Sequence, residues 1–399
     1  MVRISKPWSA KHKRVTKGGS LPYNLSNSFA QPLTSEELIQ YAKERGDQDL
    51  LDAYQKHDLT YTPNGGSLDL RQEIAQLYGP SITANHILVF TGGQVAVQTA
   101  AFAVCDHDNS HAIVFTPGYQ SLLVGPVHAG AQVTQIQLSA ANGWAIDVKQ
   151  VEAAIQENTK YIVINEPYNP AGTLMARQTQ QELIDLAAKH NIIIFCDEVY
   201  RLLEHNPEKD RLAAMCDAYQ KGMSCVTMSK PWGACGVSIG WIACQDLDLK
   251  ERMTQVQYFG TACPSRASEL QAIMVLRASD FILGKNLQII RHNVQLLREF
   301  MDRHKDLFHW VPPNAGAIAF IKLKAGKLMS DELGAQLAEH GIGIKPAYCF
   351  SGDENVTEQV DYFRVGYGES KFPTALSQFE EYVVQHRDQW LLAQESAST

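Results

Sequence analysis

Several features that would place the chain in a specialised class are missing from its 399 residues. No apolar run approaches the ~20 residues that a helix needs to cross a bilayer. Basic residues are not in excess, since 35 Lys and Arg stand against 43 Asp and Glu, which gives a formal net charge of −8. Nucleic acids and anionic membranes both favour a basic surface. We therefore expect a globular protein with a sizeable core, with no nucleic acid and no membrane among its partners.

Disulfide and metal-binding patterns are missing as well. The eight cysteines are scattered and none forms a CxxC pair, which is typical of reduced thiols in a cytoplasmic protein. The 13 histidines include no HExxH motif and no close cluster with cysteine, so we expect no metal site. The basic residues 1–17 lack the apolar stretch of a secretory signal. We expect them to pack as an arm on the acidic body, with a transit peptide as the alternative.

Short apolar runs alternate with longer amphipathic ones between about residues 85 and 245. This alternation predicts buried strands separated by helices such as 179–191, and it favours a mostly parallel sheet with helices on both faces. The runs predicted as strands are HILVF, AIVFT, TQIQL, YIVIN, NIIIFCDE, SCVTMS and IGWIAC. Residues 265–305 are predicted as long helix, and a mixed α+β pattern follows. The predicted division is an arm and part of a small domain in 1–50, a large domain in 51–285, and a C-terminal small domain in 286–399.

Glycine and polar residues follow the apolar runs, where a parallel sheet binds its ligand. Gly92-Gly93-Gln94 comes after the first run, and glycines at such a turn let backbone N–H groups approach an anion; an ordinary tight turn is the alternative. The turn is not GxGxxG, which disfavours a nicotinamide cofactor. Tyr119 follows the second run and is suited to stacking on a flat ligand. Asn169 lies in a loop that two prolines and a glycine fix after the YIVIN run.

Asp197 and Lys230 carry the strongest chemical signal. A carboxylate at the end of a buried strand is costly unless a cation or proton donor pairs with it. Lysines normally extend to water, so Lys230 directly after a buried strand is unusual. Partial burial lowers the pKa of an amine and favours its nucleophilic form. The same letters, Ser-Lys-Pro-Trp, recur at residues 5–8 in the polar arm, so the tetrapeptide says little without its context.

The strand ends thus carry, in order, a phosphate-binding turn, a stacking ring, an amide, a buried carboxylate, a phenol (Tyr200) and a nucleophilic amine. Pyridoxal 5′-phosphate is the cofactor that needs this set. From about Tyr61 to Tyr367 the chain resembles the class I/II aminotransferases of fold type I. The resemblance implies an α/β fold, with a mostly parallel sheet in a large domain and a smaller α+β domain beside it.

The resemblance also implies roles for individual residues. Lys230 bonds to the cofactor's aldehyde and later moves the Cα proton of an L-amino acid, while Asp197 pairs with the ring nitrogen. Tyr200 and Asn169 hydrogen-bond the ring oxygen, and Tyr119 stacks on the ring. The residues implied at the phosphate are Gly93, Gln94, Val95 and Thr227, together with Tyr61 reaching from a partner subunit.

Substrate binding and assembly follow from the same resemblance. Arg364 in YFRVGYG matches the arginine that clamps the substrate α-carboxylate, a task that suits a bidentate fork, and Asn169 is the second residue implied in substrate binding. These roles imply a homodimer with shared active sites. Two departures stand out: Ser238 occupies the position of the family's phosphate arginine, for which Arg266 is a candidate replacement, and Pro231-Trp232 follows the lysine directly.

Three functions remain open at this stage. The first is an aminotransferase. The second is a cyclase or dehydratase acting on hydroxyarginine, of the capreomycidine- or enduracididine-forming type, or an arginine oxidase; Glu166 is one acidic side chain that would meet a guanidinium. The third is a non-catalytic sensor built on this domain. The sequence leaves the side chain of the substrate open.

Overall fold

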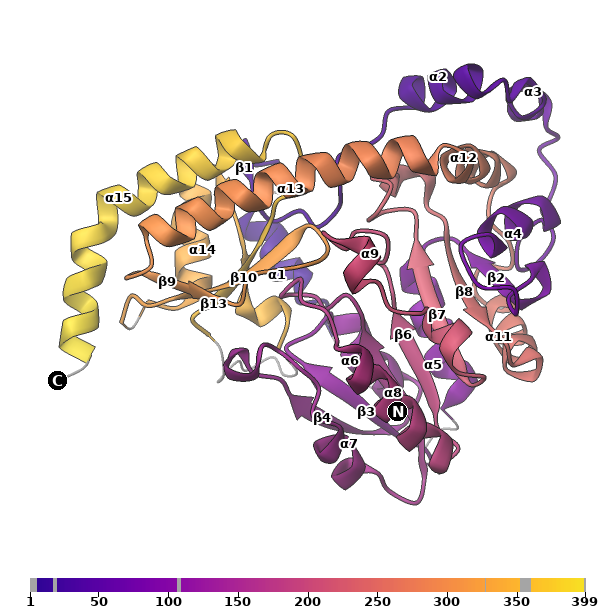
Figure 1. Cartoon of the computed structure of the whole chain (residues 1–399), viewed down its shortest axis with the longest axis horizontal. Helices are drawn as coiled ribbons and strands as arrows, with labels where there is room; N and C mark the ends of the chain where they lie inside the picture. The colour runs from indigo at the N-terminus through magenta and orange to yellow at the C-terminus, as the bar shows by residue number, and fades with distance from the viewer. Residues whose placement is uncertain (1–5, 17–19, 106–108, 327, 352–359, 398–399) are drawn as a thin grey trace.

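A seven-stranded sheet forms the centre of the larger part of the molecule (Figure 1). The computed structural model describes residues 6–16, 20–105, 109–326, 328–351 and 360–397. The strand order is β2-β8-β7-β6-β5-β3-β4, in which β8 is antiparallel to both of its neighbours and the other pairs are parallel. The strands are β2 (Ile87–Phe90), β3 (His111–Thr116), β4 (Gln132–Gln137), β5 (Thr159–Asn165), β6 (Ile193–Asp197), β7 (Gly222–Thr227) and β8 (Gly240–Cys244). The predicted mostly parallel sheet is confirmed.

Alternate side chains of the strands enter separate apolar clusters on the two faces of this sheet, as the period of two requires. Val114 and Val163 pack with α5 (Gly93–Val104), α6 (Gln120–His128) and α11 (Leu247–Tyr258). Their neighbours Ile113 and Ile162 pack on the other face. The helices of that face are α7 (Val148–Ala154) and α8 (Arg177–Lys189), and short helices α9 (Pro207–Asp210) and α10 (Met215–Ala218) follow β6.

One predicted strand is less buried than we expected. The TQIQL run belongs to β4, in which only Ile136 is buried. β4 is the outermost strand of the sheet, and an edge strand with alternating glutamines leaves one face to water.

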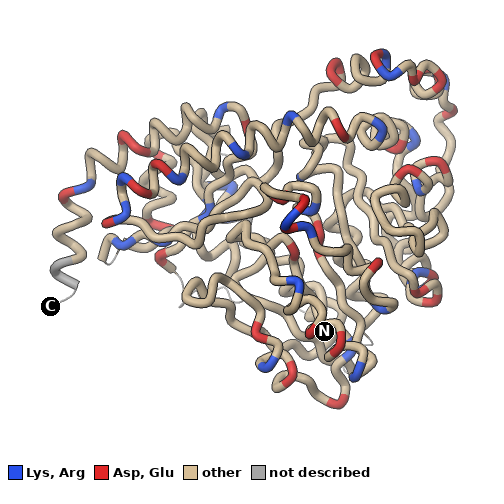
Figure 2. The backbone as a smooth tube through the Cα atoms, in the orientation of Figure 1, with Lys and Arg blue, Asp and Glu red and all other residues tan. Residues whose placement is uncertain are grey.

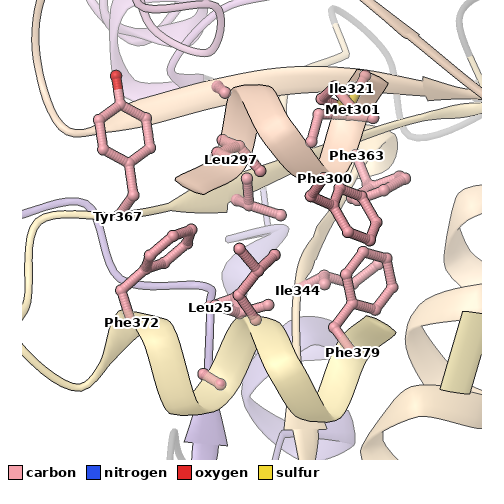
Figure 3. Packing of buried hydrophobic residues seen from close by; sticks show 14 of the residues in the cluster. Leu25, Leu297, Phe300, Met301, Ile321, Ile344, Phe363, Tyr367, Phe372 and Phe379 are labelled. Atoms are coloured by element: carbon pink, nitrogen blue, oxygen red, sulfur yellow. The ribbon is translucent and has the colours of Figure 1, made fainter. Parts of the chain in front are cut away.

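A four-stranded antiparallel sheet, in the order β12-β13-β10-β9, forms the core of the smaller part. Its strands are β9 (Phe308–Trp310), β10 (Ile318–Leu323), β12 (Lys345–Pro346) and β13 (Tyr362–Gly366). The helices around it are α13 (Ser279–Arg303), α14 (Ser330–Glu339) and α15 (Phe372–Ala397). Phe300 of α13 and Phe379 of α15 meet with ring centroids 5.4 Å apart (Figure 3). β1 (Tyr23–Asn24) pairs with β11 (Ile342–Gly343), so an N-terminal segment joins this part.

The predicted long helix over 265–305 is two helices. α12 (Arg266–Arg277) ends at Ala278, where α13 begins. The two have different packing partners: α12 contacts α2 (Ser35–Arg45), α3 (Gln48–Lys56) and α4 (Leu68–Ala75), whereas α13 runs on to α15 (Figure 1). Because the two halves of this segment pack against different elements, the chain changes direction between them, which the helical periodicity alone does not reveal. The predicted domain boundaries themselves stay predictions.

Acidic and basic residues are mixed on the surface, as expected from their similar numbers in the sequence. Figure 2 shows acidic and basic residues interspersed along α2 and α15. α1 (Ser9–Val15) carries part of the basic N-terminal arm, and Lys11 pairs with Asp331 of α14 at 3.2 Å. Within the ranges that the structure describes, no helix is long and apolar enough to cross a membrane.

Candidate active site

A cavity of about 250 Å³ lies at the carboxyl ends of β5, β6 and β7, between the two sheets. It brings together predicted residues that are far apart in sequence. The sheet side contributes Asn169, Asp197, Tyr200, Thr227 and Lys230. The start of α5 contributes Gly93 and Gln94, the start of α6 contributes Tyr119, and β13 contributes Arg364. Their chemical roles stay predictions, but one cavity holds them all.

The glycine turn leaves the first N–H groups of α5 without a side-chain partner. Gly92 has a φ of +98°, which an L side chain rarely adopts, and it leaves the start of α5 without a side-chain cap. N–H groups in the first turn of a helix have no partner within the helix and carry its positive dipole end. A Cβ on Gly240 would lie 2.8 Å from the Gly93 nitrogen. A glycine is therefore required there for β8 to lie so close to the turn.

Neutral hydroxyls complete this corner of the cavity. Thr227 Oγ1 donates to the Ile239 carbonyl at 3.1 Å and lies 3.2 Å from Ser229 Oγ. Ser229, which the sequence analysis did not single out, also lines the cavity. Helix N–H groups and hydroxyls together suit a phosphate.

Asp197 is a carboxylate held out of water. Burial raises its pKa to about 7, although the Val199 N–H, 3.3 Å from Oδ1, and the nearby Lys230 both act in the opposite direction. A carboxyl in this environment favours a cationic partner in the cavity. The amine of Lys230 donates to Ser28 Oγ at 3.0 Å, which fixes it at the same cavity wall.

Arg364 presents an unsatisfied guanidinium. Its two terminal nitrogens donate to Asn169 Oδ1 and to the Ser26 carbonyl, each at 2.9 Å. Its Nε is buried and makes no hydrogen bond in the described part of the chain. Burial also lowers the pKa of the guanidinium. A carboxylate arriving here would supply both charge and acceptors.

Several predicted residues lie away from this cavity. Val95 follows Gln94 in the first turn of α5 but does not line the cavity wall. Tyr61 is 95% exposed and does not line the cavity. Ser238 is exposed and adopts a left-handed φ of +54°.

Arg266, the candidate replacement for a phosphate arginine, is held elsewhere. Its guanidinium contacts Asp69 at 2.6 Å and Glu269 at 3.1 Å. Glu166, considered for a guanidinium substrate, is also outside this cavity; its two oxygens lie 3.0 Å from the Met175 N–H, and burial raises its pKa to about 8.

Sequence reasoning missed Lys345, a second partly buried amine at the cavity wall. The signal was available, because the residue stands in the apolar run GIGIKPAYCF. The reasoning that singled out Lys230 as a lysine in an apolar setting applies equally to this one.

Comparison with known proteins explains the arrangement. The family model "aminotransferase class I and II" matches residues 24–367. The chain belongs to this family. It is 26% identical to capreomycidine synthase from Streptomyces vinaceus over 76% of this chain and 75% of that protein. It is 24% identical to an aspartate aminotransferase from Thermotoga maritima over 86% of this chain and 87% of that protein.

Solved structures agree on the fold. A PLP-dependent aminotransferase from Streptococcus suis superimposes with a TM-score of 0.87 at 24% identity, covering 96% of this chain and 98% of that one. The predicted α/β fold of type I is therefore confirmed, as are the enzyme class and the cofactor, pyridoxal phosphate. The donor set fits that group, because the open helix start suits its phosphate, the buried Asp197 suits a protonated ring nitrogen, and Lys230 suits its aldehyde.

Proposed function

We propose that the enzyme is an aminotransferase, which moves the amino group of an L-amino acid to an oxo acid. One observation carries the proposal: the amine of Lys230, the carboxyl of Asp197 and the guanidinium of Arg364 line a single cavity. In that order, these groups would act on the Cα proton of the substrate, the ring nitrogen of the cofactor and the carboxylate of the substrate.

The bound cofactor supplies a ring that withdraws electrons from Cα. Lys230 Nζ holds the cofactor and then moves the proton at Cα as a general base and acid. Asp197 keeps the ring nitrogen protonated, because a buried carboxylate is stabilised by a positive partner. Arg364 orients the substrate by its carboxylate, and the Asn169 amide at 2.9 Å fixes the direction of the guanidinium. Tyr119 forms part of the cavity wall, where it would stack on the cofactor ring.

We also propose that the enzyme works as a homodimer with shared sites. Tyr61 and Leu59 are each 95% exposed, and Phe259 is 89% exposed. Thr62 Oγ1 donates to the Pro264 carbonyl at 2.7 Å, which ties the Leu59–Tyr61 segment to the chain that follows α11. Large apolar side chains at these exposures favour a protein partner. In a dimer, Tyr61 would reach the phosphate of the other subunit.

A second candidate is a cyclase or dehydratase on a hydroxylated arginine. The observation that favours it is the 26% identity to a capreomycidine synthase. Both reactions begin with removal of the Cα proton and differ in what leaves afterwards. Lys230, Asp197 and Arg364 would therefore serve either reaction, and only the products distinguish the two.

The test is a mass-spectrometric product screen with cofactor-loaded enzyme. Proteinogenic amino acids and hydroxylated arginines are each supplied with and without an oxo acid. We expect exchange of amine for carbonyl only when an oxo acid is present. Loss of water without an acceptor would instead establish the cyclase or dehydratase, and consumption of O₂ with arginine would establish an oxidase.

A further inference from the structure

Lys345 lies beside Arg364 on the small-sheet wall of the cavity. The two residues are direct partners in the register of β12 and β13, so their side chains leave the same face of the sheet. Both cations also lie over the ring of Phe350, with Lys345 Nζ 5.6 Å and Arg364 Cζ 5.2 Å from its centroid. Both line the cavity. The substrate half of the cavity therefore carries two adjacent cations.

These cations have no anionic partner in the described ranges of the chain. Arg364 donates to an amide oxygen and a carbonyl, and its Nε has no acceptor. Among the same residues, Lys345 Nζ takes part in no ion pair or hydrogen bond and has only the contact with the Phe350 ring. Asp197 is the one described carboxylate that lines the cavity, and the ring nitrogen of the cofactor uses it. Arg364 Nε is buried without an acceptor, which is costly, and Lys345 adds an unpaired, partly buried charge beside it.

We propose that Lys345 binds an acidic group on the side chain of the substrate while Arg364 binds its α-carboxylate. The preferred substrates are then dicarboxylic amino acids and oxo acids. One carboxylate satisfies the open edge of the Arg364 fork, so a monocarboxylic substrate leaves Lys345 unpaired. A substrate with a guanidinium or ammonium side chain meets like charge, which is an effective means of rejecting it. The preference among substrates rests on the proposed aminotransferase function, whereas the binding of a dicarboxylate does not.

Protonation of Lys345 is part of this recognition. Burial, reinforced by the charge of Arg364, lowers the pKa of its amine to about 7. The other groups that face it are Lys230, Cys349, Lys13 and His12. A carboxylate beside the amine raises its pKa again. Above pH 7, binding of a dicarboxylate should therefore take up a proton.

Binding of unreactive ligands tests the inference without turnover. Succinate and propionate are titrated calorimetrically into PLP-loaded enzyme at pH 8, in two buffers of different ionisation enthalpy. We expect Lys345→Met to weaken succinate about 10-fold or more, to change propionate less than about 2-fold, and to remove the proton uptake. Lys345→Arg should keep the preference for succinate but lose the uptake, because arginine stays charged. The matched control is Lys322→Met, a lysine of the same sheet that pairs with Asp361 at 3.1 Å.

Other outcomes overturn the assignment. Equal weakening of both ligands would place Lys345 in the α-carboxylate site, and unchanged succinate affinity would remove it from binding. Kinetics separates this inference from the proposed function. Dicarboxylate-selective binding that depends on Lys345, without any exchange of amine, would refute the aminotransferase and leave the inference intact. Exchange restricted to monocarboxylic substrates, with Lys345→Met unaffected, would refute the inference alone.

Discussion

The letters Ser-Lys-Pro-Trp occur twice in this chain, and the two copies have different surroundings. At residues 229–232 the lysine lines the cavity and the tryptophan is fully buried, with Nε1 donating to Ser279 Oγ at 2.8 Å. In the copy at residues 5–8, the structure describes Lys6 as exposed and Trp8 as half-buried. The same four residue types therefore occupy different environments, and local sequence alone does not specify an active site.

The difference comes from what lies before and above each segment. β7 is buried along its whole length, and the second copy follows two residues after its carboxyl end. The chain from Ala30 to Leu33 covers it, because Ala30 N donates to the Lys230 carbonyl and Leu33 N to the Gly233 carbonyl. Gly233 has a φ of +63°, and a Cβ on it would overlap the Gln31 carbonyl. The described part of the first copy, residues 6–8, leads instead into the short helix α1.

Replacing each of the two lysines by alanine in turn should give the largest difference between the two copies. Lys230→Ala should abolish the absorbance of the lysine-bound cofactor and reduce turnover about 10,000-fold or more, since the base and the covalent anchor are lost together. Lys6→Ala should leave both unchanged. Absorbance spectra and kcat of the two variants measure this directly. Loss of the absorbance in Lys6→Ala, or its retention in Lys230→Ala, would show that the site is wrongly assigned.

Asp197 sharpens the contrast, because it lines the same cavity and the charge of Lys230 helps to lower its pKa against the effect of burial. Asp197→Asn removes the charge and keeps the shape. Breaking a buried ion pair costs about 3–5 kcal/mol, so turnover should fall about 100- to 5,000-fold while part of the cofactor stays bound. Cofactor released on denaturation gives the occupancy, and kcat is corrected for it. Full turnover at full occupancy would mean that the ring nitrogen does not depend on this carboxylate.

The two tryptophans extend the comparison to stability. Trp232→Ala empties a site that is 0% exposed and leaves Ser279 Oγ without its donor. Such truncations cost about 3–5 kcal/mol. Trp8→Ala should cost less, about 1 kcal/mol, because its ring is only half-buried where it packs against the cluster of α5 and α6. Thermal unfolding of both variants measures the difference, and equal shifts in Tm would contradict it.

Most of the large sheet could be predicted from the sequence, because buried parallel strands are apolar throughout and their ends collect the polar residues. The order of glycine turn, Asn169, Asp197 and Lys230 therefore predicted one cavity. Features that depend on tertiary partners were less accessible. The break at Ala278 and the exposure of β4 follow from which elements each segment packs against, and periodicity does not encode that.

The small-sheet wall was harder to predict for a similar reason. Arg364 was found through a resemblance, whereas Lys345 was overlooked because it belongs to a strand of two residues, which is too short to show a pattern. Only the pairing of β12 with β13 brings the two cations side by side. Residues that act from a second sheet are set by register across it, and register is a long-range property.

The smallest expected effect concerns what holds the first copy of Ser-Lys-Pro-Trp in place. Gln120 Oε1 accepts from Trp8 N at 2.8 Å, and Gln120 Nε2 donates to the Lys6 carbonyl at 2.9 Å. These two bonds tie the arm to the residue next to Tyr119. Gln120→Ala should cost about 1 kcal/mol or less, because each partly exposed bond contributes little. Amide hydrogen exchange of residues 6–16 should speed up, while the absorbance of the lysine-bound cofactor stays the same. Unchanged exchange would mean that these two bonds do not hold the arm, and a changed absorbance would mean that the two copies are coupled through Tyr119.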